Sequence, residues 1–188
     1  MANVNHNTLT DPYLHEPKGA STAAAGDVYI ADGAGSGAWT QAHTYVNGYI
    51  AFDSTTPAYQ HSITTSFTPL NPTFVLSTTL GWTGLSSPNA RLRYDGTANI
   101  TAAVQFCVSF KNNSGTSRDI EIIFRKNGGV LNGAHAIDTA VSGEWKTLVI
   151  ADYGSFATND YLEVFIKGSA SFTLDIAGAN LTVMGVPA

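Results

Sequence analysis

The sequence holds a single cysteine, Cys107, among 188 residues. A chain with one cysteine forms no disulfide within itself, so the small folds held together by disulfides are excluded. Charged residues are also scarce, at 12% of the chain where roughly 25% is usual for soluble domains. Serine, threonine, asparagine and glycine supply the polarity instead, and this composition is typical of β-rich surfaces and of proteins that assemble.

Basic residues are outnumbered by acidic ones, 9 against 14, which gives a formal net charge of -5. Binding to phosphates needs clustered Lys and Arg, so we expect no nucleic-acid partner. No run approaches the ~20 apolar residues that span a bilayer, so we expect no membrane partner either. The first residues lack the basic start and apolar run of a signal peptide, which predicts synthesis in the cytoplasm.

Motifs that would indicate catalysis or a bound cofactor are missing as well. The 5 histidines show no HxH or HxxxH spacing, and the acidic residues form no DxDxDG-type loop, so we expect no metal site. There is no GxSxG nucleophile motif, and nothing in the pattern selects a pair of catalytic carboxylates. We therefore expect neither enzyme activity nor a cofactor.

The chain does contain a strong two-residue period between residues 98 and 126. Successive strand side chains point to opposite faces, so this period predicts two strands that each have one buried and one wetter face. The residues at 112–115, Asn-Asn-Ser-Gly, tolerate positive φ, so we predict that the two strands form an antiparallel hairpin. Ile123 falls on the wetter face, which predicts burial by a partner chain. The alternating apolar residues are Val104, Phe106, Val108 and Phe110 in the first strand and Ile120, Ile122 and Phe124 in the second.

Similar patterns recur at short spacing from Tyr45 onward, separated by turn residues such as Asp95-Gly96 and Ser142-Gly143. No window of helical length shows a 3.6-residue period. About ten strands in this length favour an all-β, antiparallel sandwich or jelly roll, which we assign to residues 41–188. The predicted strands cover residues 45–53, 58–67, 73–80, 90–95, 98–111, 118–127, 130–138, 145–151, 160–167 and 171–184.

Residues 1–40 differ in kind from the rest. They are rich in Ala, Gly, Ser and Thr, and they hold too little apolar surface to offset the entropy of ordering by themselves. Two interpretations are open: a disordered leader, or an extended arm that orders against a partner surface. The apolar and aromatic anchors favour the arm, and they are Tyr13, Leu14, Val28, Tyr29, Ile30 and Trp39.

Residues 81–89 read as a loop that exposes Trp82 and Leu85. Such exposure is costly without a partner, so we expect these two residues to contact something outside the domain. Aromatic residues elsewhere more often fill a core or a subunit interface, although stacking on sugars in a lectin-like site stays open as an alternative.

The segments between Arg91 and Val183 also resemble a known family. They resemble the tumour-necrosis-factor/C1q-like jelly roll in the form common in bacteriophage virion proteins, and residues 14–39 resemble leader segments of phage structural proteins. This resemblance implies a homotrimer, and we expect the sheet face bearing Tyr49, Tyr161 and Phe165 to form its interface. The segments that match are Arg91–Gly96, Ile100–Phe110, Ile120–Gly128 with its Lys126-Asn127-Gly128 turn, Asn159–Ile166 with its Asp160-Tyr161 pair, and Ala179–Met184.

The function implied by this resemblance is that of a non-enzymatic phage structural protein located in the virion. It would be a capsid decoration protein of the cement or head-fibre type, in which residues 1–40 bind the major capsid protein and residues 41–188 form a trimeric jelly roll. The alternative is a tail-fibre or receptor-binding tip that recognises a host-surface glycan. The two share a fold and a trimer, and the modest length of the chain favours decoration.

Overall fold

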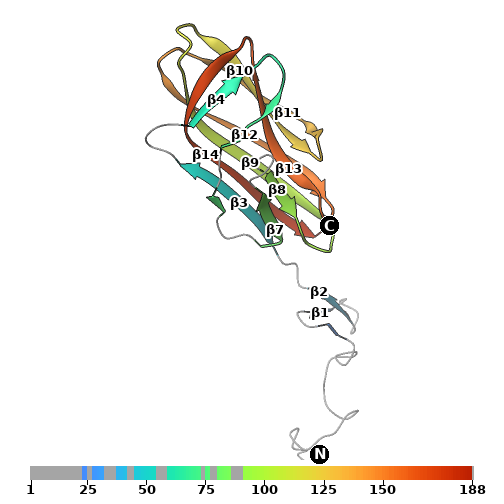
Figure 1. The fold of residues 1–188 in the computed structure, drawn as a ribbon. Coiled ribbons are helices and arrows are strands. Elements are labelled where there is room, and N and C mark those ends of the chain that lie inside the picture. Colours follow the sequence, from blue (N-terminus) through green and yellow to red (C-terminus); the bar gives the residue numbers. More distant parts are fainter. Residues whose placement is uncertain are drawn as a thin grey trace, which may run out of the picture. The chain divides into compact units, whose positions relative to one another are not determined.

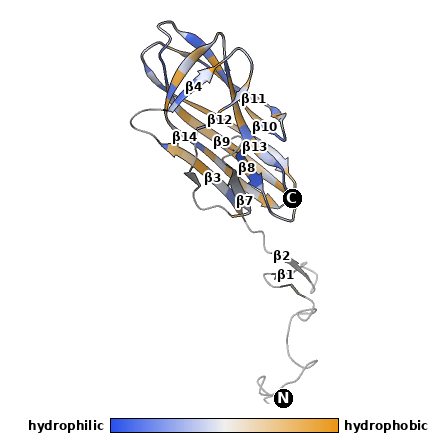
Figure 2. Cartoon of the chain, in the orientation of Figure 1, coloured by the Kyte–Doolittle hydropathy of each residue, from blue (hydrophilic) through white to orange (hydrophobic). Residues whose placement is uncertain are grey.

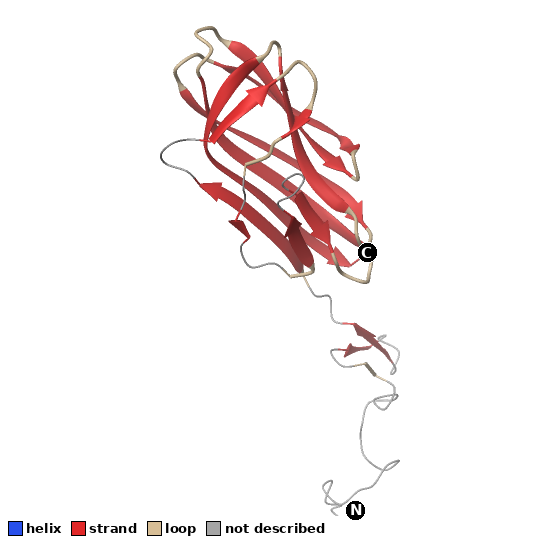
Figure 3. Ribbon diagram, in the orientation of Figure 1, coloured by secondary structure: helices blue, strands red, loops and turns tan. Residues whose placement is uncertain are grey.

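The computed structural model describes residues 23–24, 27–31, 37–41, 45–53, 59–72, 75–76, 80–85 and 91–187. Throughout this part the regular structure consists of β-strands (Figures 1 and 3). No helix in the described residues is long and apolar enough to cross a membrane. The chain divides into two compact units, Met1–Thr44 and Tyr45–Ala188.

The first unit contains a short antiparallel strand pair, β1 (Asp27–Ala31) and β2 (Gly37–Gln41). Tyr29 lies opposite Trp39 in the register, and their ring centroids are 5.4 Å apart in an edge-on arrangement. Local pairing of this kind was not among the predicted strands, because the five-residue segments carry too few apolar residues to stand out from their Gly- and Ala-rich surroundings.

The second unit is built from two antiparallel sheets, each with six strands (Figure 1). The β9 sheet has the order β12–β9–β14–β3–β6, with β4 paired to β14, and the β10 sheet has the order β11–β10–β13–β8–β7, with β5 paired to β13. The strands of the β9 sheet are β3 (Val46–Asp53), β4 (Tyr59–Ile63), β6 (Val75–Leu76), β9 (Ile100–Asn112), β12 (Trp145–Phe156) and β14 (Phe172–Pro187). Those of the β10 sheet are β5 (Thr68–Pro69), β7 (Trp82–Leu85), β8 (Arg91–Tyr94), β10 (Arg118–Lys126), β11 (Gly129–Ala140) and β13 (Tyr161–Gly168).

The chain passes repeatedly from one sheet to the other. It leaves β8 for β9, returns to β10 and β11, crosses to β12, returns to β13 and ends in β14 at the centre of the β9 sheet. Two antiparallel sheets connected in this way form a jelly-roll sandwich. The predicted fold class, an all-β antiparallel jelly roll, is therefore confirmed.

The predicted hairpin between residues 98 and 126 is wrong in its pairing. Both strands exist, but β9 pairs with β12 and β14, whereas β10 pairs with β11 and β13. The turn between them carries the chain from one sheet to the other. The two-residue period reports which face of a strand is buried and contains no information about which strand lies beside it.

A buried asparagine holds this crossing in place. Asn112, at the end of β9, has no exposed surface. Its Nδ2 donates to the backbone carbonyls of Thr116 and Ala140, each at 2.8 Å. Its Oδ1 accepts a hydrogen bond from the backbone N–H of Ser114, also at 2.8 Å. One side chain therefore connects β9, the turn after it and the end of β11.

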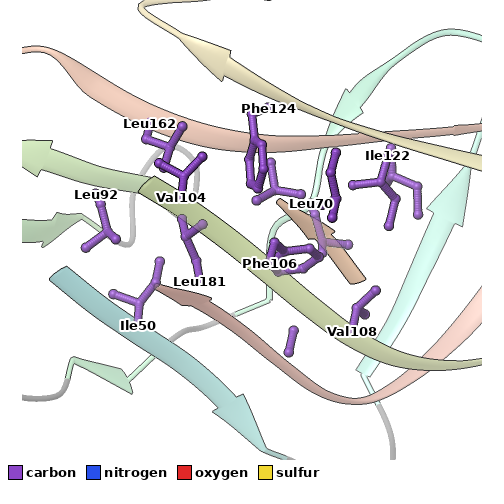
Figure 4. Packing of buried hydrophobic residues seen from close by; sticks show 14 of the residues in the cluster. Ile50, Leu70, Leu92, Val104, Phe106, Val108, Ile122, Phe124, Leu162 and Leu181 are labelled. Atoms are coloured by element: carbon purple, nitrogen blue, oxygen red, sulfur yellow. The ribbon is translucent and has the colours of Figure 1, made fainter. Parts of the chain in front are cut away.

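The core lies between the inner faces of the two sheets (Figure 4). Figure 2 shows hydrophobic and hydrophilic residues alternating along the longer strands, as expected when only one face of each is covered. The alternating residues predicted for β9 and β10 are all buried, and Figure 4 labels Val104, Phe106 and Val108 opposite Ile122 and Phe124.

Trp82 belongs to this core, so the prediction that a loop exposes it is wrong. It lies in β7 and is 3% exposed. Its ring packs against Tyr94 and Phe156, with centroids 5.2 and 5.1 Å away. Gly48 makes room for it, since a Cβ at that position would lie 2.9 Å from the Trp82 Cγ. The side chain of Leu85 lies outside the described residues.

Ile123 is buried by its own chain and not, as predicted, by a partner. It lies on the outer face of the β10 sheet, in register between His135 and Phe165, and has no exposed surface. The ring of Phe67 covers this area: its centroid is 6.4 Å from that of His135, and the Lys167 Nζ lies 4.5 Å from it. The segment before β5 thus covers part of the outer face of the β10 sheet, and the alternation of residues within β10 does not predict this.

His61 on β4 gives the fold a dependence on pH. It is 6% exposed, its Nε2 has no hydrogen-bond partner in the described residues, and burial lowers the pKa of its imidazole below the ordinary 6.5. The unfolded chain therefore binds the proton more readily than the folded chain does. Above pH 6.5 the titration of His61 leaves the free energy of unfolding unchanged. Below pH 6.5 it lowers the free energy of unfolding, by up to about 1.4 kcal/mol per pH unit.

We predict that His61→Phe removes this slope. Urea unfolding between about pH 7.5 and about pH 5 measures it, in a range above the titration of Glu121 and Asp160, whose pKa values are lowered. The control Tyr59→Phe, a change beside His61 that leaves its imidazole in place, should keep the slope. An equal slope in His61→Phe and in the unmodified chain would contradict the prediction.

Candidate functional site

The outer face of the β9 sheet is the main candidate for an interaction site. The registers of β12, β9, β14 and β3 place nineteen uncharged side chains or glycines outward here, and the carboxylate of Asp53, opposite Gly178, lies at their margin. We call this surface the uncharged face. It comprises Thr147, Val149, Ala151, Tyr153 and Ser155 of β12; Thr101, Ala103, Gln105, Cys107 and Ser109 of β9; Gly178, Asn180, Thr182, Met184 and Val186 of β14; Asn47, Tyr49 and Ala51 of β3; and Tyr45 before β3.

Several large side chains of the uncharged face are open to solvent. Tyr153 is 67% exposed and Met184 is 61% exposed, and both are register partners of the small Ala103 that lies between them. Hollows of about 180 and 250 Å³ adjoin Met184 on its two sides, the larger one also lined by Tyr45 and Leu80. Large apolar side chains next to hollows allow a second protein surface to pack closely against this one, with shape complementarity.

Charged groups gather at one end of this sheet instead. Lys111 and Asp175 form an ion pair at 3.6 Å, and the Gln60 Nε2 donates to the Asp175 Oδ1 at 3.3 Å. The Lys111 Nζ also lies 5.3 Å from the ring centroid of Trp145. An uncharged centre with a charged border is the arrangement found in protein–protein interfaces.

Cys107 lies within the uncharged face, in register with Val149 on β12 and Asn180 on β14. Its side chain is half-buried and its thiol is free. Because it is the chain's one cysteine, its reactivity reports directly on whether this face is covered.

The three residues predicted for the trimer interface do not share one sheet face. Tyr49 lies on the uncharged face, opposite Thr182. Tyr161 and Phe165 lie on β13, in the other sheet. There an arginine covers each ring: the Cζ of Arg91 is 4.4 Å from the Tyr161 centroid, and the Cζ of Arg125 is 4.3 Å from that of Phe165.

Sequence reasoning missed Tyr153, Met184 and Val186. The sequence of β12 did contain a sign that Tyr153 lies in an interface, because large apolar residues occur on both faces of this strand. Leu148 and Ile150 face inward, and Val149 and Tyr153 face outward. Apolar residues in both phases indicate that both faces of a strand are covered.

Four of the six predicted anchoring residues lie in the β1–β2 pair. Tyr29 and Trp39 contact each other in the β1–β2 pair, as described above. Val28 and Ile30 alternate with Tyr29 and are 43% and 50% exposed, so the pair presents two apolar side chains to its surroundings. Tyr13 and Leu14 lie outside the described residues.

The described residues contain no group of three or more His, Cys, Asp or Glu side chains arranged to hold a metal ion. The most deeply buried carboxylate, that of Glu163, is 3% exposed and lies 3.6 Å from the Arg91 Nε. This pair joins β13 to β8 and has the character of a structural ion pair.

No protein-family model matches the chain. No curated protein matches it either. Solved structures with distant likeness include Eiger TNF from S. frugiperda, at 12% identity and a TM-score of 0.48, with 77% of this chain and 92% of that one covered. Murine APRIL at pH 8.0 has 15% identity and a TM-score of 0.47, covering 75% and 98%. The EclA C-terminal domain, described as a sugar-binding protein, has 16% identity and a TM-score of 0.35, covering 69% and 81%.

Proposed function

We propose that this chain is a non-enzymatic structural protein of a phage virion, a homotrimeric capsid decoration protein. Three copies associate through the uncharged face, and residues 1–40 bind the major capsid protein. The observation that carries the proposal is the uncharged face itself.

The composition of this face argues for association. Monomeric soluble proteins rarely leave a contiguous apolar patch of several hundred Å² open to water. Tyr153 and Met184 flank Ala103 in the register, and Val149 lies further along β12 beside Cys107, so a second copy lying against this sheet can cover all three exposed side chains. Covering them stabilises the assembly by roughly 25 cal/mol for each Å² of apolar surface removed from water. The number three rests on the resemblance of residues 91–183 to tumour-necrosis-factor/C1q-like jelly rolls.

The separate first unit supports the anchoring role. The chain divides after Thr44, so this unit can bind a surface without disturbing the sandwich. Its exposed Val28 and Ile30 suit a shallow apolar contact. In a trimer three such weak contacts act together, and the high effective concentration of the second and third arms makes the combined attachment strong.

The alternative, a tail-fibre or receptor-binding tip, shares the fold and the trimer. Sequence reasoning offered several aromatic residues for its glycan contact, namely Tyr45, Tyr49, Phe52, Tyr59, Trp82 and Tyr94, and the two of these that lie in β7 and β8, Trp82 and Tyr94, are buried in the core. The decoration role is therefore the better supported of the two.

The first test concerns the trimer. We predict that the full chain has a solution mass of three times 19.8 kDa, and that the double change Tyr153→Lys/Met184→Lys converts it to the monomer by placing charges in the interface. In the unmodified chain Cys107 should react slowly with a bulky maleimide, and in the double variant quickly. Ser117→Lys, which adds a charge at an exposed turn, is the control and should stay trimeric. A monomeric unmodified chain would refute the interface.

The second test concerns the anchor and is independent of the first. Full-length protein carrying Val28→Asp/Ile30→Asp, and a variant lacking residues 1–40, should both stay trimeric and fail to bind capsids stripped of this protein. Capsid occupancy measured by gel densitometry gives the result. Full occupancy by the shortened chain would exclude residues 1–40 as the anchor while leaving the trimer standing.

A further inference from the structure

A hollow on the outer surface of the β10 sheet belongs to neither the uncharged face nor the β1–β2 pair. Its volume is about 340 Å³. We infer that this surface, the β10 hollow, binds a hydroxyl-rich ligand of the size of a single sugar, such as the terminal residue of a glycan. The inference goes beyond the proposed function and does not depend on it. The side chains that carry the argument are Thr65, Asp119, Glu121, Ile137, Lys167 and Ser169.

The sheet positions the central side chains of the hollow. Glu121 on β10 lies in register with Ile137 on β11 and with Lys167 on β13, so three neighbouring strands present one row of side chains. Asp119 comes two residues before Glu121 and therefore points to the same outer face. Ser169 follows β13 directly. Groups fixed on paired strands lose little entropy when they bind a ligand.

The hollow offers both donors and acceptors of hydrogen bonds. The Ser169 Oγ accepts from the backbone N–H of Asp119 at 3.1 Å, so its own proton is available to donate. The Lys167 Nζ is 2.7 Å from the Glu121 Oε2, and its ammonium has three protons to share. Asp119 accepts from the Thr139 hydroxyl through one oxygen, at 2.8 Å, which leaves acceptor capacity on its carboxylate.

The carboxylate of Glu121 is kept ionised at neutral pH. Burial raises the pKa of this group, but the hydrogen bonds and charges of Lys167 and His135 outweigh that effect and lower it overall. The Lys167 ammonium also rests over the Phe67 ring, 4.5 Å from its centroid, which fixes the ammonium beside the hollow. The Lys167 donor is thus oriented by Glu121 and Phe67 before any ligand arrives, and Asp119 supplies the acceptor.

Ile137 supplies an apolar surface within this polar border. It is 65% exposed and is the single large apolar side chain of the hollow that is open to water. A pyranose ring has the matching character, with hydroxyls at its rim that donate and accept and a C–H face that packs on an aliphatic group. Pockets that hold small ligands commonly combine an apolar surface with a few placed polar groups.

Other classes of ligand fit less well. Asp119 and Glu121 together outweigh the one ammonium of Lys167, so the hollow repels a phosphate or another anion. A divalent cation would need several free oxygen ligands, but Glu121 is already bound to Lys167 and His135, and the described residues offer no three-ligand group. A purely apolar ligand would leave the charged groups without partners.

Amide NMR titration of the full-length chain tests this inference. The probes are the neutral methyl glycosides of glucose, galactose, mannose and N-acetylglucosamine, with inorganic phosphate and calcium chloride as competing classes. We expect at least one glycoside to shift the amides of Asp119, Ile137 and Ser169 saturably, and phosphate and calcium to leave them unchanged.

Two changes of different kind separate ligand binding from folding. Asp119→Ala/Ser169→Ala removes the carboxylate and the hydroxyl that serve as polar partners, and Ile137→Arg fills the hollow without removing a hydrogen bond. Each should raise the dissociation constant of the glycoside at least about tenfold. Val130→Arg, a change at an exposed position of the same strand outside the hollow, and Glu144→Gln in a turn should leave affinity unchanged. Glycoside shifts that persist in Ile137→Arg, shifts by phosphate or calcium alone, or no shifts with any glycoside would each overturn the inference.

Discussion

Replacing Asn112 by aspartate is expected to lower the free energy of unfolding by about 4 kcal/mol. The aspartate keeps the acceptor for the Ser114 N–H, but it puts a carboxylate oxygen against the carbonyls of Thr116 and Ala140, to which the Asn112 Nδ2 now donates. The position has no exposed surface, so water cannot screen the repulsion. Urea unfolding at neutral pH and fixed protein concentration measures the loss.

The matched control for this change is the next residue. Asn113→Asp introduces the same charge in an exposed position of the same turn, and we expect it to change stability by less than about 0.5 kcal/mol. Under acid conditions the difference in the free energy of unfolding between Asn112→Asp and Asn113→Asp should become smaller, because protonation removes the buried charge. Equal stabilities for the two variants would show that Asn112 does not hold the crossing between the sheets.

Trp82→Ala is expected to cost about 3 to 5 kcal/mol. The indole is 3% exposed and packs on Tyr94, Phe156 and the backbone at Gly48, so its removal leaves a cavity that the surrounding strands cannot fill. Its Nε1 has no hydrogen-bond partner in the described residues, and Trp82→Phe should therefore recover a large part of the loss. Thermal and urea unfolding measure both variants.

Trp145→Ala is the matched control for Trp82, since it removes the same side chain from a position that is 50% exposed. We expect it to cost less than about 1 kcal/mol. If the two alanine variants were equally stable, the packing of Trp82 in the core would be contradicted. A glycan-binding defect in Trp82→Ala would have to be read as a consequence of lost stability.

The faces of the strands were predictable from the sequence, and their neighbours were not. Val104, Phe106 and Phe110 alternate with polar residues, and this period alone fixes which side of β9 is buried. The partner strands β12 and β14 lie tens of residues away, and nothing in the pattern of β9 specifies them. The mistaken hairpin followed from assuming that consecutive strands pair.

The candidate interface was less predictable for the same reason. Tyr49 and Tyr161 have similar surroundings in the sequence, yet β3 and β13 belong to different sheets. Their placement depends on long-range pairing. Ile123 is placed by long-range pairing with His135 and Phe165, and the Phe67 ring lies beside His135. A local signal of the uncharged face was carried by β12 and by the end of β14, where Val183 faces inward and Met184 and Val186 face outward.

The position of β14 has a consequence for how the chain folds. This strand, formed by Phe172–Pro187, is the last described one along the sequence, yet it lies in the middle of the β9 sheet, between β9 and β3. Until the ribosome has released it, β3 and β9 have no common neighbour, and their backbone groups on those edges have nothing to pair with. Pairings this distant in sequence also form slowly. We expect the nascent chain to stay open until β14 has been synthesised, and to need protection from aggregation during that interval.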